Sequence, residues 1–423
     1  MADIIKGPKG IKDVLPSESY KWQYIENTAR NIAKTYNINE VRVPMFEHTE
    51  LFHRGVGDTT DVVQKEMYTF LDKGNRSITL RPEGTASTVR LCLENSLLNG
   101  ALPLKTYYVV PNFRYEKPEA GRLRQHHQFG VEYFGTKDPS ADAEVISVAH
   151  TLLKKLQINN AEVHINSIGC NTCRPTFHEN LTKFFEDKKE HLCELCNDRL
   201  YKNPMRIIDC KNANCKEIAK DAPLAIDNLC EECDTHFADV KKYLTTLDIP
   251  FVVDTSIVRG LDYYTKTVFE FVSKESGLTI CGGGRYDGLV ETLGGKPTPA
   301  LGFGCGIERL IMMLENVSDG FGDSPCPEIF IANIGDEANL FVSKLVLDLR
   351  LNGVKAEKDI SLRTLKAQMK YADKINAKYT TVIGDGELET LECTVKNMET
   401  GEKETIKLSE IENFIKGAQN EKN

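Results

Sequence analysis

Residues 106–134 carry the pattern that most constrains the fold, because two β-like runs flank a polar loop. The first run, 106–116, alternates apolar and polar side chains, and so does the second, 126–134. Paired, they predict a hairpin with one apolar face. The opposite face carries Arg114, Glu116, Gln128 and Glu132. Charges on a sheet face are costly to bury unless a ligand satisfies them, so the hairpin predicts either a solvated surface or a polar binding site.

Length, charge and cysteine content narrow the class of protein. A chain of 423 residues is long enough for two or three domains with ample core. Its net charge of −9 gives no global positive field, so a nucleic acid would have to be bound by local basic patches. The 13 cysteines without a secretory start favour a reducing, cytoplasmic compartment. No apolar run is long enough to predict a membrane span, so no membrane partner is expected.

The segment before the hairpin predicts a mixture of helix and strand. Apolar spacing predicts a helix over 19–36, and a short strand ends at Pro44. Proline cannot donate to a central ladder, so this strand is expected at a sheet edge or an interface. A second hairpin over 66–84 leads into a helix over 86–98. Glu83, just before that helix, could hold a substrate ammonium or cap the helix N-terminus.

Residues 170–236 predict a module inserted into the sheet pattern, because Cys, Asn, Asp and Lys replace alternating strands there. Two Cys-x-x-Cys pairs about 35 residues apart can wrap one tetrahedral zinc. The expected zinc ligands are Cys193, Cys196, Cys230 and Cys233. Further cysteines leave the ligand set ambiguous and a second ion open, namely Cys170, Cys173, Cys210 and Cys215. Ordinary reduced thiols are the alternative.

Two glycine-rich stretches follow the module. Three consecutive glycines at 282–284 allow a ligand to approach the backbone closely. In ALGFGCGIERLIMML, alternate glycines at 302, 304 and 306 leave one strand face open to a flat ring. Arg309, in the first turn of the amphipathic helix that follows, opposes the helix dipole. That placement indicates an external anion, with a structural salt bridge as the alternative.

The end of the chain predicts a separate small domain. Residues 317–327 predict a linker, and strands then alternate with helices in an α/β domain of about 100 residues. A helix predicted over 362–378 has a basic stripe of Arg363, Lys366, Lys370, Lys374 and Lys378. This stripe is either a solvated face or a surface that follows nucleic acid phosphates.

Three of these patterns resemble the motifs of class II aminoacyl-tRNA synthetases. They are the strand that ends at Pro44, the sequence FRYE at 113–116, and GFGCGIER at 302–309. LRPEGT at 80–85 and VRGLDYY at 258–264 are similar to the histidine-binding sequences of the histidyl-tRNA synthetase family. The resemblance covers essentially the whole chain. The cysteine-rich module departs from it, and the resemblance does not settle its metal content.

The resemblance implies an α+β fold with a class II synthetase antiparallel sheet flanked by helices, an inserted Cys-rich helical module and a C-terminal α/β anticodon-binding domain. It also implies a homodimer formed through the first motif. The expected parts are a first catalytic part over 1–169, the insertion over 170–236, a second catalytic part over 237–322 and the anticodon-binding domain over 323–423.

The activity that the resemblance implies is ATP-dependent ligation of L-histidine to tRNA(His), with Mg²⁺, through a histidyl-adenylate that releases AMP and pyrophosphate. The residues implied for ATP are Arg114 and Arg259 at the α-phosphate, Arg309 at the distal phosphate and Glu116 at the adenine amine. Those implied for histidine are Glu83, Thr85 and Gln128 around the ammonium, and Glu132, Tyr264, Tyr263 and Arg259 around the rest of the substrate. Nothing in this scheme requires zinc, so adenylate formation is expected to be independent of it.

Two alternatives share the resemblance. One is a catalytically inactive paralogue that serves as a regulatory subunit of histidine biosynthesis. Intact Arg114, Arg259 and Arg309 and a full C-terminal domain speak against it. The other is a class II synthetase for a different amino acid, against which the RGLDYY loop speaks.

Overall fold

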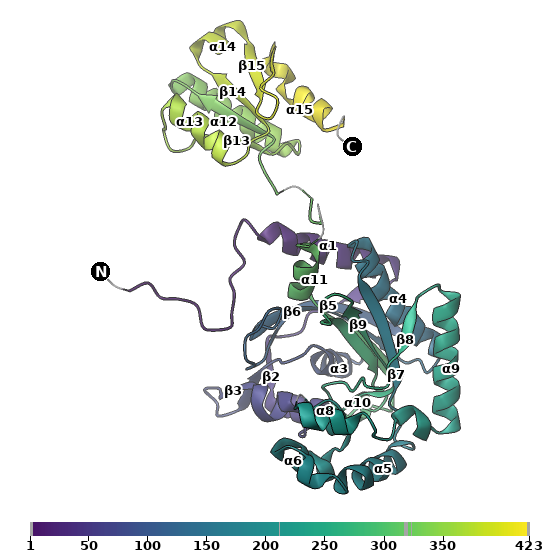
Figure 1. Ribbon diagram of the computed structural model, residues 1–423. Helices are drawn as coiled ribbons and strands as arrows, with labels where there is room; N and C mark the ends of the chain where they lie inside the picture. Colours follow the sequence, from purple (N-terminus) through teal and green to yellow (C-terminus); the bar gives the residue numbers. More distant parts are fainter. Residues whose placement is uncertain (1–2, 211, 317–319, 323, 421–423) are drawn as a thin grey trace. The chain divides into compact units, whose positions relative to one another are not determined.

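The computed structural model describes residues 3–210, 212–316, 320–322 and 324–420. The chain divides into two compact units, Met1–Gly322 and Asp323–Asn423 (Figure 1). Residues 317–319 and 323 of the predicted linker lie outside the described residues. Across the described ranges, no helix combines the length and the apolar character needed to cross a membrane.

The larger unit is built on an eight-stranded sheet with the order β1-β5-β6-β11-β10-β9-β7-β8. Its strands are β1 (Asn39–Glu40), β5 (Leu104–Phe113), β6 (Gln125–Phe134), β7 (Ala161–Ser167), β8 (Phe251–Val253), β9 (Thr265–Ser273), β10 (Thr279–Arg285) and β11 (Ala300–Gly306). The two edge pairs, β1–β5 and β7–β8, are parallel, and the pairs between them are antiparallel. The sheet is therefore mixed, with an antiparallel centre. The strand predicted to end at Pro44 is β1, which ends earlier, at Glu40, and lies at the edge of the sheet as expected.

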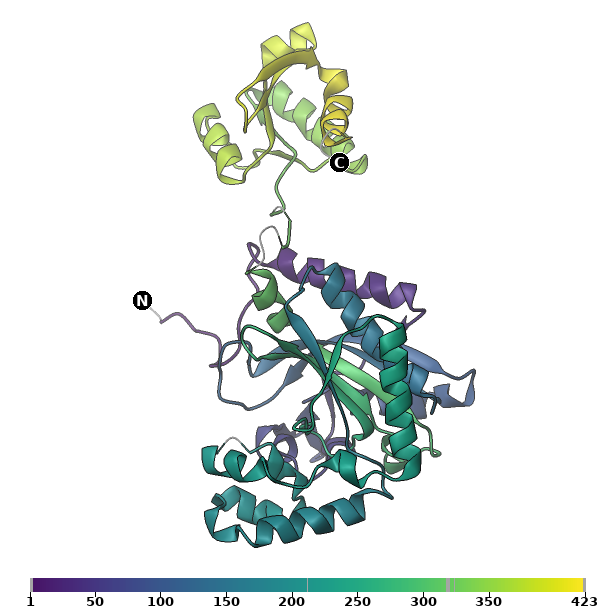
Figure 2. The same ribbon diagram turned by 45° about the vertical axis from the view of Figure 1, so that its right-hand side comes forward.

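Four helices pack on one face of this sheet. They are α1 (Ser19–Thr35), α4 (Pro139–Lys155), α9 (Glu231–Thr246) and α11 (Ile307–Leu314). Figure 2 shows α4 and α9 side by side. Their apolar faces share one core with the sheet, in which Ile25 of α1, Phe129 of β6 and Phe303 of β11 are fully or almost fully buried. Burying each side chain of this size contributes about 1.5–3 kcal/mol to the free energy of folding. This energy determines which side chains of each strand face the core, and the alternate side chains therefore face the site.

Smaller elements partly cover that other face. They are α2 (Thr49–Val56), a π-helical turn (Val62–Glu66), α3 (Thr85–Glu94), a 3₁₀ turn (Leu97–Asn99), α10 (Leu289–Thr292) and a sheet of β2 (Phe46–His48), β4 (Ser77–Leu80) and β3 (Tyr68–Leu71). The predicted second hairpin is β3–β4. Arg81, at its end, is 2% exposed and donates to the carbonyls of Pro111 (2.8 Å), Val43 (2.7 Å) and Pro44 (2.6 Å). These bonds tie the small sheet to the large one.

The cysteine-rich module lies between β7 and α9. Its helices are α5 (Arg174–Glu186), α6 (Glu194–Lys202), α7 (Met205–Ile208) and α8 (Ala213–Ala219), with 3₁₀ turns at Lys189–His191 and Ala225–Asn228. Figure 1 shows α5, α6 and α8 gathered together, away from α1. Buried side chains such as Phe185 and Leu200 join a cluster that includes Ile257, Tyr264 and Val268 of the catalytic part. The module therefore packs as an extension of that part.

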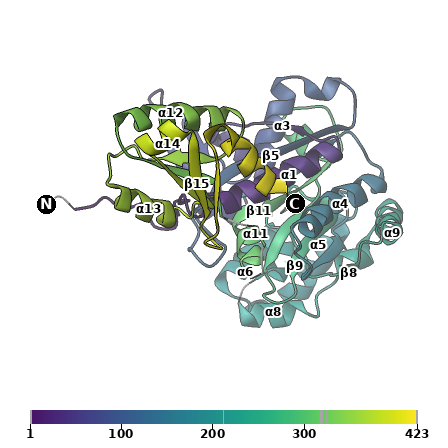
Figure 3. The same cartoon turned by 90° about the horizontal axis from the view of Figure 1, so that it is seen from above.

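The smaller unit has its own five-stranded sheet, in the order β13-β12-β14-β15-β16. Its elements are β12 (Ile329–Asn333), α12 (Asp336–Leu351), β13 (Ala356–Lys358), α13 (Leu365–Lys374), β14 (Tyr379–Ile383), α14 (Asp385–Thr390), β15 (Glu392–Asn397), β16 (Lys403–Lys407), a 3₁₀ turn (Leu408–Glu410) and α15 (Ile411–Asn420). Ile329 and Ile331 face α12 and α15, whereas Phe330 and Ala332 face α13. Figure 3 shows α12 and α13 on opposite sides of the strands.

Helix α13 is shorter than the sequence predicted. The expected range was 362–378, but the helix begins at Leu365 and ends at Lys374. Leu362 has a left-handed φ of +52° and is 91% exposed, so it is not on the apolar face of the helix. Lys378 lies beyond the helix, where its N–H donates to the carbonyl of Pro327 (3.0 Å). The part of the predicted basic stripe that lies on the helix is therefore Lys366, Lys370 and Lys374.

Candidate active site

Three glycines form a row across the centre of the large sheet. Gly282 on β10 pairs with Gly304 on β11, and Gly304 pairs with Gly130 on β6. A Cβ at each position would collide with a side chain that lies across it, namely Arg259 at Gly282, Gln128 at Gly304 and Tyr108 at Gly130. The glycines therefore give three polar side chains room to lie flat against the sheet. The open strand face predicted for a flat ring is partly filled by the protein's own side chains.

Glu132 on β6 is the buried centre of this face. It is 0% exposed and accepts hydrogen bonds from the hydroxyls of Thr85 (2.8 Å), Tyr108 (2.9 Å) and Tyr286. Gly302 on β11 leaves space for its carboxylate. Burial raises the pKa of Glu132 to about 8, although the hydroxyl donors favour its charged form. A carboxyl group that titrates near neutrality is thus held in place by neutral donors.

Glu83 approaches the same region from the start of α3. Its two carboxylate oxygens accept from the N–H groups of Thr85 (2.7 Å) and Ala86 (2.8 Å). Of the two interpretations of Glu83, the helix cap is the one that the structure contains. Burial raises the pKa of Glu83, and the two amides act in the opposite direction.

Three tyrosine rings form one wall of the site. The centroid of the Tyr263 ring lies 4.7 Å from that of Tyr264 and 5.4 Å from that of Tyr286. Burial raises the pKa of Tyr264 and of Tyr286, so both phenols stay neutral and can donate hydrogen bonds. Tyr263 and Tyr264 come from the loop between β8 and β9, as the sequence predicted, whereas Tyr286 follows β10 directly.

Arg259 comes from the same loop and lies over Gly282. It forms an ion pair with Glu270 on β9, and its guanidinium carbon lies 5.6 Å from the centroid of the Tyr264 ring. Glu270 also accepts from the hydroxyl of Thr279 at 2.7 Å. Burial alone would lower the pKa of Arg259, but Tyr264 and Glu270 outweigh it and raise the pKa. Arg259 is therefore a permanent cation with a fixed direction.

A second group of charges gathers where the β5–β6 hairpin ends. Arg114 donates through Nε to the carbonyl of Pro82 (2.8 Å), and its Nη1 lies 3.8 Å from Oε1 of Glu116. Arg122, from the loop of the hairpin, forms an ion pair with Glu116. Burial first, and then the charge of Arg114, lower the pKa of nearby His126 to about 3. The imidazole thus stays neutral in a region of positive potential.

Arg309 completes this group from the first turn of α11. It donates to the carbonyls of Gly121 (3.2 Å) and Thr279. The hydrogen-bond partners it has in the described part of the chain are main-chain carbonyls, so the alternative of a structural salt bridge is not formed there. Burial and the charge of Arg122 lower the pKa of Arg309, although the charges of Glu116 and Glu270 act in the opposite direction. This arrangement suits an external anion.

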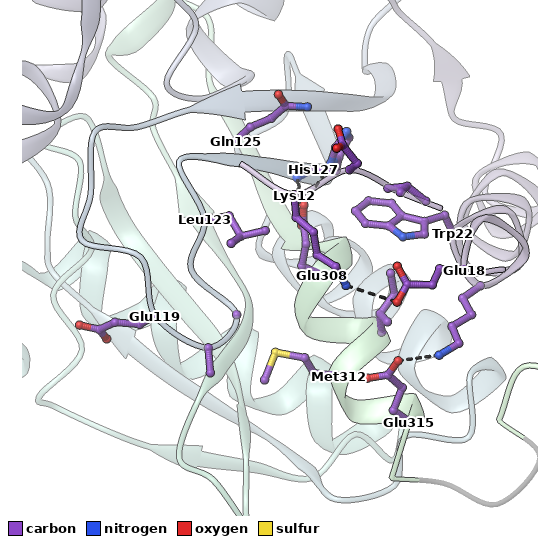
Figure 4. A pocket seen from close by; sticks show the side chains of 16 residues that line it. Lys12, Glu18, Trp22, Glu119, Leu123, Gln125, His127, Glu308, Met312 and Glu315 are labelled. Atoms are coloured by element: carbon purple, nitrogen blue, oxygen red, sulfur yellow. Dashed lines mark hydrogen bonds and ion pairs between the residues drawn. The ribbon is translucent and has the colours of Figure 1, made fainter. Parts of the chain in front are cut away.

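A pocket of about 270 Å³ lies outside this group of charges, between the N-terminal segment, α1, the hairpin loop and α11. Two ion pairs lie among its charged side chains (Figure 4): Lys12 with Glu18 (3.4 Å) and Lys21 with Glu315 (2.6 Å). Gly121, which accepts from Arg309, also lines the pocket. The pocket therefore adjoins the charged region, and both of the lysines that line it are paired.

The cysteines of the insertion form two groups where the sequence predicted one set. Two compact clusters are present, one of Cys170, Cys173, Cys230 and Cys233, the other of Cys193, Cys196, Cys210 and Cys215. The predicted ligand set of Cys193, Cys196, Cys230 and Cys233 is wrong in its pairing, because its two halves belong to different clusters. The start of α9 returns to the end of β7, which pairs the first and last Cys-x-x-Cys sequences.

Comparison with known families agrees with this geometry over most of the chain. The sequence model of histidyl-tRNA synthetase matches residues 10–310, and that of an anticodon binding domain matches residues 328–418. The chain belongs to the histidyl-tRNA synthetase family. Its fold is the class II synthetase fold of that family, with the anticodon-binding domain in the smaller unit.

Individual members of the family are similar to the chain over its full length. The histidine–tRNA ligase of Caldanaerobacter subterraneus subsp. tengcongensis is 54% identical over 98% of this chain and 100% of that protein. That of Acetivibrio thermocellus is 52% identical with the same coverage. The crystal structure of apo Staphylococcus aureus histidyl-tRNA synthetase has a TM-score of 0.82 at 42% identity, covering 98% of this chain and 100% of that one.

Most of the side chains on the site face were predicted from the sequence. In the structure they form two groups. One set is Glu83, Thr85, Gln128, Glu132, Arg259, Tyr263 and Tyr264, and the other is Arg114, Glu116 and Arg309. The residues that sequence reasoning missed are Tyr108, Asn112, Glu270 and Tyr286. The alternation of β5 could have indicated Tyr108 and Asn112, which share a face with Val110. Glu270 and Tyr286 depend on contacts between strands that a single sequence does not display.

Proposed function

We propose that this protein is a histidine–tRNA ligase that uses ATP to join L-histidine to tRNA(His), releasing AMP and pyrophosphate. The observation that carries the proposal is the buried Glu132, which is held by neutral hydroxyls on the same face of the sheet as the fixed cation Arg259. A site of this kind suits an amino acid whose side chain offers a ring N–H and whose carboxylate must be directed at a phosphate. Membership of the histidyl-tRNA synthetase family supports the same reaction.

Recognition of the imidazole is assigned to Glu132 and Tyr264. The carboxyl group of Glu132 at one ring nitrogen and the phenol of Tyr264 at the other would hydrogen-bond both nitrogens, and no other natural side chain offers such a pair of ring nitrogens. A site built to hydrogen-bond a substrate group rejects analogues that lack the group, because its own buried polar atoms are then left unpaired. Full burial of Glu132 makes that penalty large. Tyr263 would close the pocket against the ring.

The substrate ammonium is assigned to Glu83 and Thr85, with Gln128 nearby. Capping α3 does not prevent Glu83 from holding an ammonium, because each carboxylate oxygen has more than one lone pair. Gln128 is held over Gly304 by Asn112, whose amide donates to its side-chain oxygen at 2.9 Å. The side-chain oxygen of Gln128 has a second lone pair, which would accept from the substrate ammonium.

The first chemical step joins histidine to the nucleotide. A carboxylate oxygen of histidine attacks the α-phosphorus of ATP, the bond from phosphorus to the bridging oxygen breaks, and pyrophosphate leaves with the electron pair. Arg114 and Arg259 would stabilise the α-phosphate from two sides, Arg309 would hold the distal phosphate, and Glu116 would accept from the adenine amine. Charge stabilisation by donors already fixed in position is the main source of catalysis in such displacements.

Magnesium would accompany the phosphates of ATP. Bound there, it would neutralise phosphate charge. Glu270 would offer it a carboxylate oxygen. Glu270 contacts Arg259 and Thr279, and the carbonyl of Thr279 accepts from Arg309. Carboxylate oxygens are the protein ligands that this ion prefers.

The second step moves the histidyl group to the terminal ribose of the tRNA. The smaller unit would bind the anticodon end, in line with the family match over residues 328–418. The expected assembly is a homodimer formed through the region of the strand that ends at Pro44, and the expected location is the cytoplasm. The cysteine clusters of the insertion would add structural zinc to the cofactors.

ATP–pyrophosphate exchange across the twenty amino acids tests the proposal. Exchange should be supported by histidine and not by the other nineteen, and purified tRNA(His) should then be charged with histidine. Exchange with a different amino acid would assign another class II specificity. A folded protein without any exchange would instead match the regulatory subunit, a function against which Arg114, Arg259 and Arg309 speak. A Bacillus halodurans structure described as an ATP phosphoribosyltransferase regulatory subunit/histidyl-tRNA synthetase is 22% identical, with a TM-score of 0.63, and shows the shared fold alone.

A further inference from the structure

Eight of the cysteines lie in two compact groups within the insertion. In each group, the four sulfur atoms lie within 4.8 Å of one another, and all eight thiols are free. The Sγ of Cys170 is 3.8 Å from that of Cys173 and 3.9 Å from that of Cys230. In the second group, the Sγ atoms of Cys193 and Cys210 are 3.8 Å apart. These separations are far beyond a disulfide bond of about 2.05 Å.

The spacing fits one metal ion per group. A tetrahedral zinc with bonds of about 2.3 Å to sulfur has sulfur–sulfur edges of about 3.8 Å, which is the separation observed in both groups. The four sulfurs of each group all lie within 4.8 Å of one another, which is close enough to enclose a single ion. Packing of reduced thiols does not require four sulfur atoms to gather in this way, and two such groups of four are present here.

Main-chain amides point at the sulfurs in both groups. In the first, the N–H of Cys230 donates to Sγ of Cys173 at 3.1 Å. In the second, the N–H of Cys193 donates to Sγ of Cys215 at 3.3 Å, and that of Asn212 to Sγ of Cys210 at 3.4 Å. Hydrogen bonds of this kind stabilise thiolate ligands and orient them toward a metal.

Helix N-termini also favour the thiolate form of two of these cysteines. Cys193 is the N-cap residue of α6 and Cys230 that of α9. The positive end of a helix dipole stabilises a thiolate at this position. The second cysteine of each pair, Cys196 or Cys233, lies in the first turn and is fully buried.

We propose that the insertion contains two separate tetrathiolate zinc sites, one formed by Cys170, Cys173, Cys230 and Cys233, the other by Cys193, Cys196, Cys210 and Cys215. The first site joins the beginning of the insertion to its end, because its two Cys-x-x-Cys sequences follow β7 and begin α9. The second site closes the middle of the insertion, between the start of α6 and the segment that leads into α8.

The middle of the insertion also forms hydrogen bonds with the loop that carries Arg259. Asp262, in that loop, accepts from Nη2 of Arg206 at 2.6 Å and from the amide of Asn203 at 3.1 Å. Both donors come from the segment between Cys196 and Cys210, so the second zinc fixes where they lie. On the other side, Asp262 accepts from the hydroxyl of Thr59 in the catalytic part.

The first site is connected to the same loop by a hydrogen bond from the residue next to one of its cysteines. Arg174, the residue after Cys173, donates to the carbonyl of Tyr264. Both zinc ions therefore hold the loop that carries Arg259, Tyr263 and Tyr264. Zinc is thus expected to matter for histidine binding, contrary to the sequence-based expectation that adenylate formation is independent of it. This consequence rests on the proposed function, whereas the presence of zinc does not.

Metal analysis of the full chain, purified without chelators, tests the two sites. Two zinc ions per chain are expected. The double variants Cys170→Ser with Cys173→Ser and Cys193→Ser with Cys196→Ser should each keep one, and the control Cys326→Ser should keep both. In cobalt-loaded protein, both sites should give thiolate-to-metal absorption, and each double variant should lose about half of it. One zinc per chain, or iron in place of zinc, would overturn the assignment.

Alkylation of the wild-type protein keeps the test valid if a variant fails to fold. The eight cluster thiols should be protected in the native protein and become reactive after zinc is removed, while half-exposed Cys326 should react in both states. A metal-free native protein in which the eight thiols react as readily as Cys326 would rule the sites out.

Kinetics test the contact with the histidine loop. Cys193→Ser with Cys196→Ser should raise the KM for histidine in pyrophosphate exchange about tenfold, equivalent to about 1.4 kcal/mol of lost loop ordering. The KM for ATP should change much less. Asp262→Asn should raise the KM for histidine in the same direction and retain both zinc ions. Loss of the second zinc with an unchanged KM for histidine would overturn the link between the zinc site and the loop.

Discussion

At the scale of single residues, the site combines charges that are fixed with one that can titrate. Arg259 is held by Glu270 and Tyr264, so its guanidinium is positioned before any substrate binds. Glu132, by contrast, is held by hydroxyls, and burial brings its pKa to about 8. The two residues therefore predict different experimental signatures, one in the rate of the chemical step and one in the dependence on pH.

Arg259→Ala should lower the kcat of adenylation by roughly 10²–10³, the usual scale for one lost charge-stabilising donor. The loss should fall on kcat because Arg259 is assigned to the phosphate that changes charge in the transition state. ATP–pyrophosphate exchange at saturating histidine and ATP measures the effect. Arg76→Ala, on the exposed β3–β4 turn, is the matched control and should leave the rate unchanged. A variant altered only in the KM for histidine would contradict the assignment.

Glu132→Gln should raise the KM for histidine and remove a pH dependence of stability. The folded protein keeps the Glu132 proton up to a pH of about 8, whereas the unfolded chain releases it near the usual pKa of 4.5. The folded state thus binds more protons between these values. Stability contributed by this proton is fully present below pH 4.5 and is lost as the pH rises toward 8. The total change is on the order of a few kcal/mol.

Denaturant unfolding at pH 5 and pH 9 can measure this difference. The chain has a single tryptophan, Trp22, which packs on His127 in the larger unit, so its fluorescence reports that unit alone. Relative to wild type, Glu132→Gln should be more stable at pH 9 than at pH 5. Glu50→Gln, with an exposed side chain, should show no such change. Equal behaviour of the two variants would show that Glu132 ionises normally.

At the scale of the elements, alternation along single strands was predictable, and contact between strands was not. The hairpin of β5 and β6 and its two faces followed from the period of two in its sequence. The row of Gly282, Gly304 and Gly130 depends on the registers of three strands, two of them far apart in the chain. For the same reason, the sequence predicted the cysteines as candidate metal ligands, but it could not predict their division into two groups.

Helix α13 carries the element-scale prediction. Lys366, Lys370 and Lys374 lie on its exposed face, at a spacing of four residues that follows one side of a helix. Lys370→Glu with Lys374→Glu should weaken tRNA binding and flatten its dependence on salt, because fewer phosphate counterions are released. ATP–pyrophosphate exchange should stay unchanged, since no nucleic acid takes part in it.

The control for α13 is a charge reversal on the opposite face of the same unit. Lys344 on α12 and Lys416 on α15 belong to helices that pack on the other side of the small sheet. Lys344→Glu with Lys416→Glu makes the same change in net charge. If both double variants reduced the salt dependence equally, the effect would be one of net charge, and the α13 stripe would be a solvated face.

At the scale of the whole molecule, the two units have separate cores. Every buried cluster of the larger unit is formed by residues before Gly322. Those of the smaller unit are formed by residues between Ile329 and Ile415. The sequence indicated this division through the linker and the change to alternating strands and helices, because both are local signals. The chemistry assigned to the larger unit should therefore survive without the smaller one.

A chain that ends at Gly322 should keep histidine-dependent ATP–pyrophosphate exchange within a few-fold of wild type. Adenylation is assigned to residues of the larger unit, and the buried clusters of that unit are formed by its own residues. Transfer to tRNA should fall by roughly two orders of magnitude in kcat/KM, equivalent to about 2.7 kcal/mol of lost tRNA contact. Both reactions can be measured on one preparation, with Trp22 fluorescence as the check that the unit is folded. A folded truncated chain that has lost exchange would show that the smaller unit takes part in adenylation, whereas unchanged charging would remove its assigned role in binding tRNA.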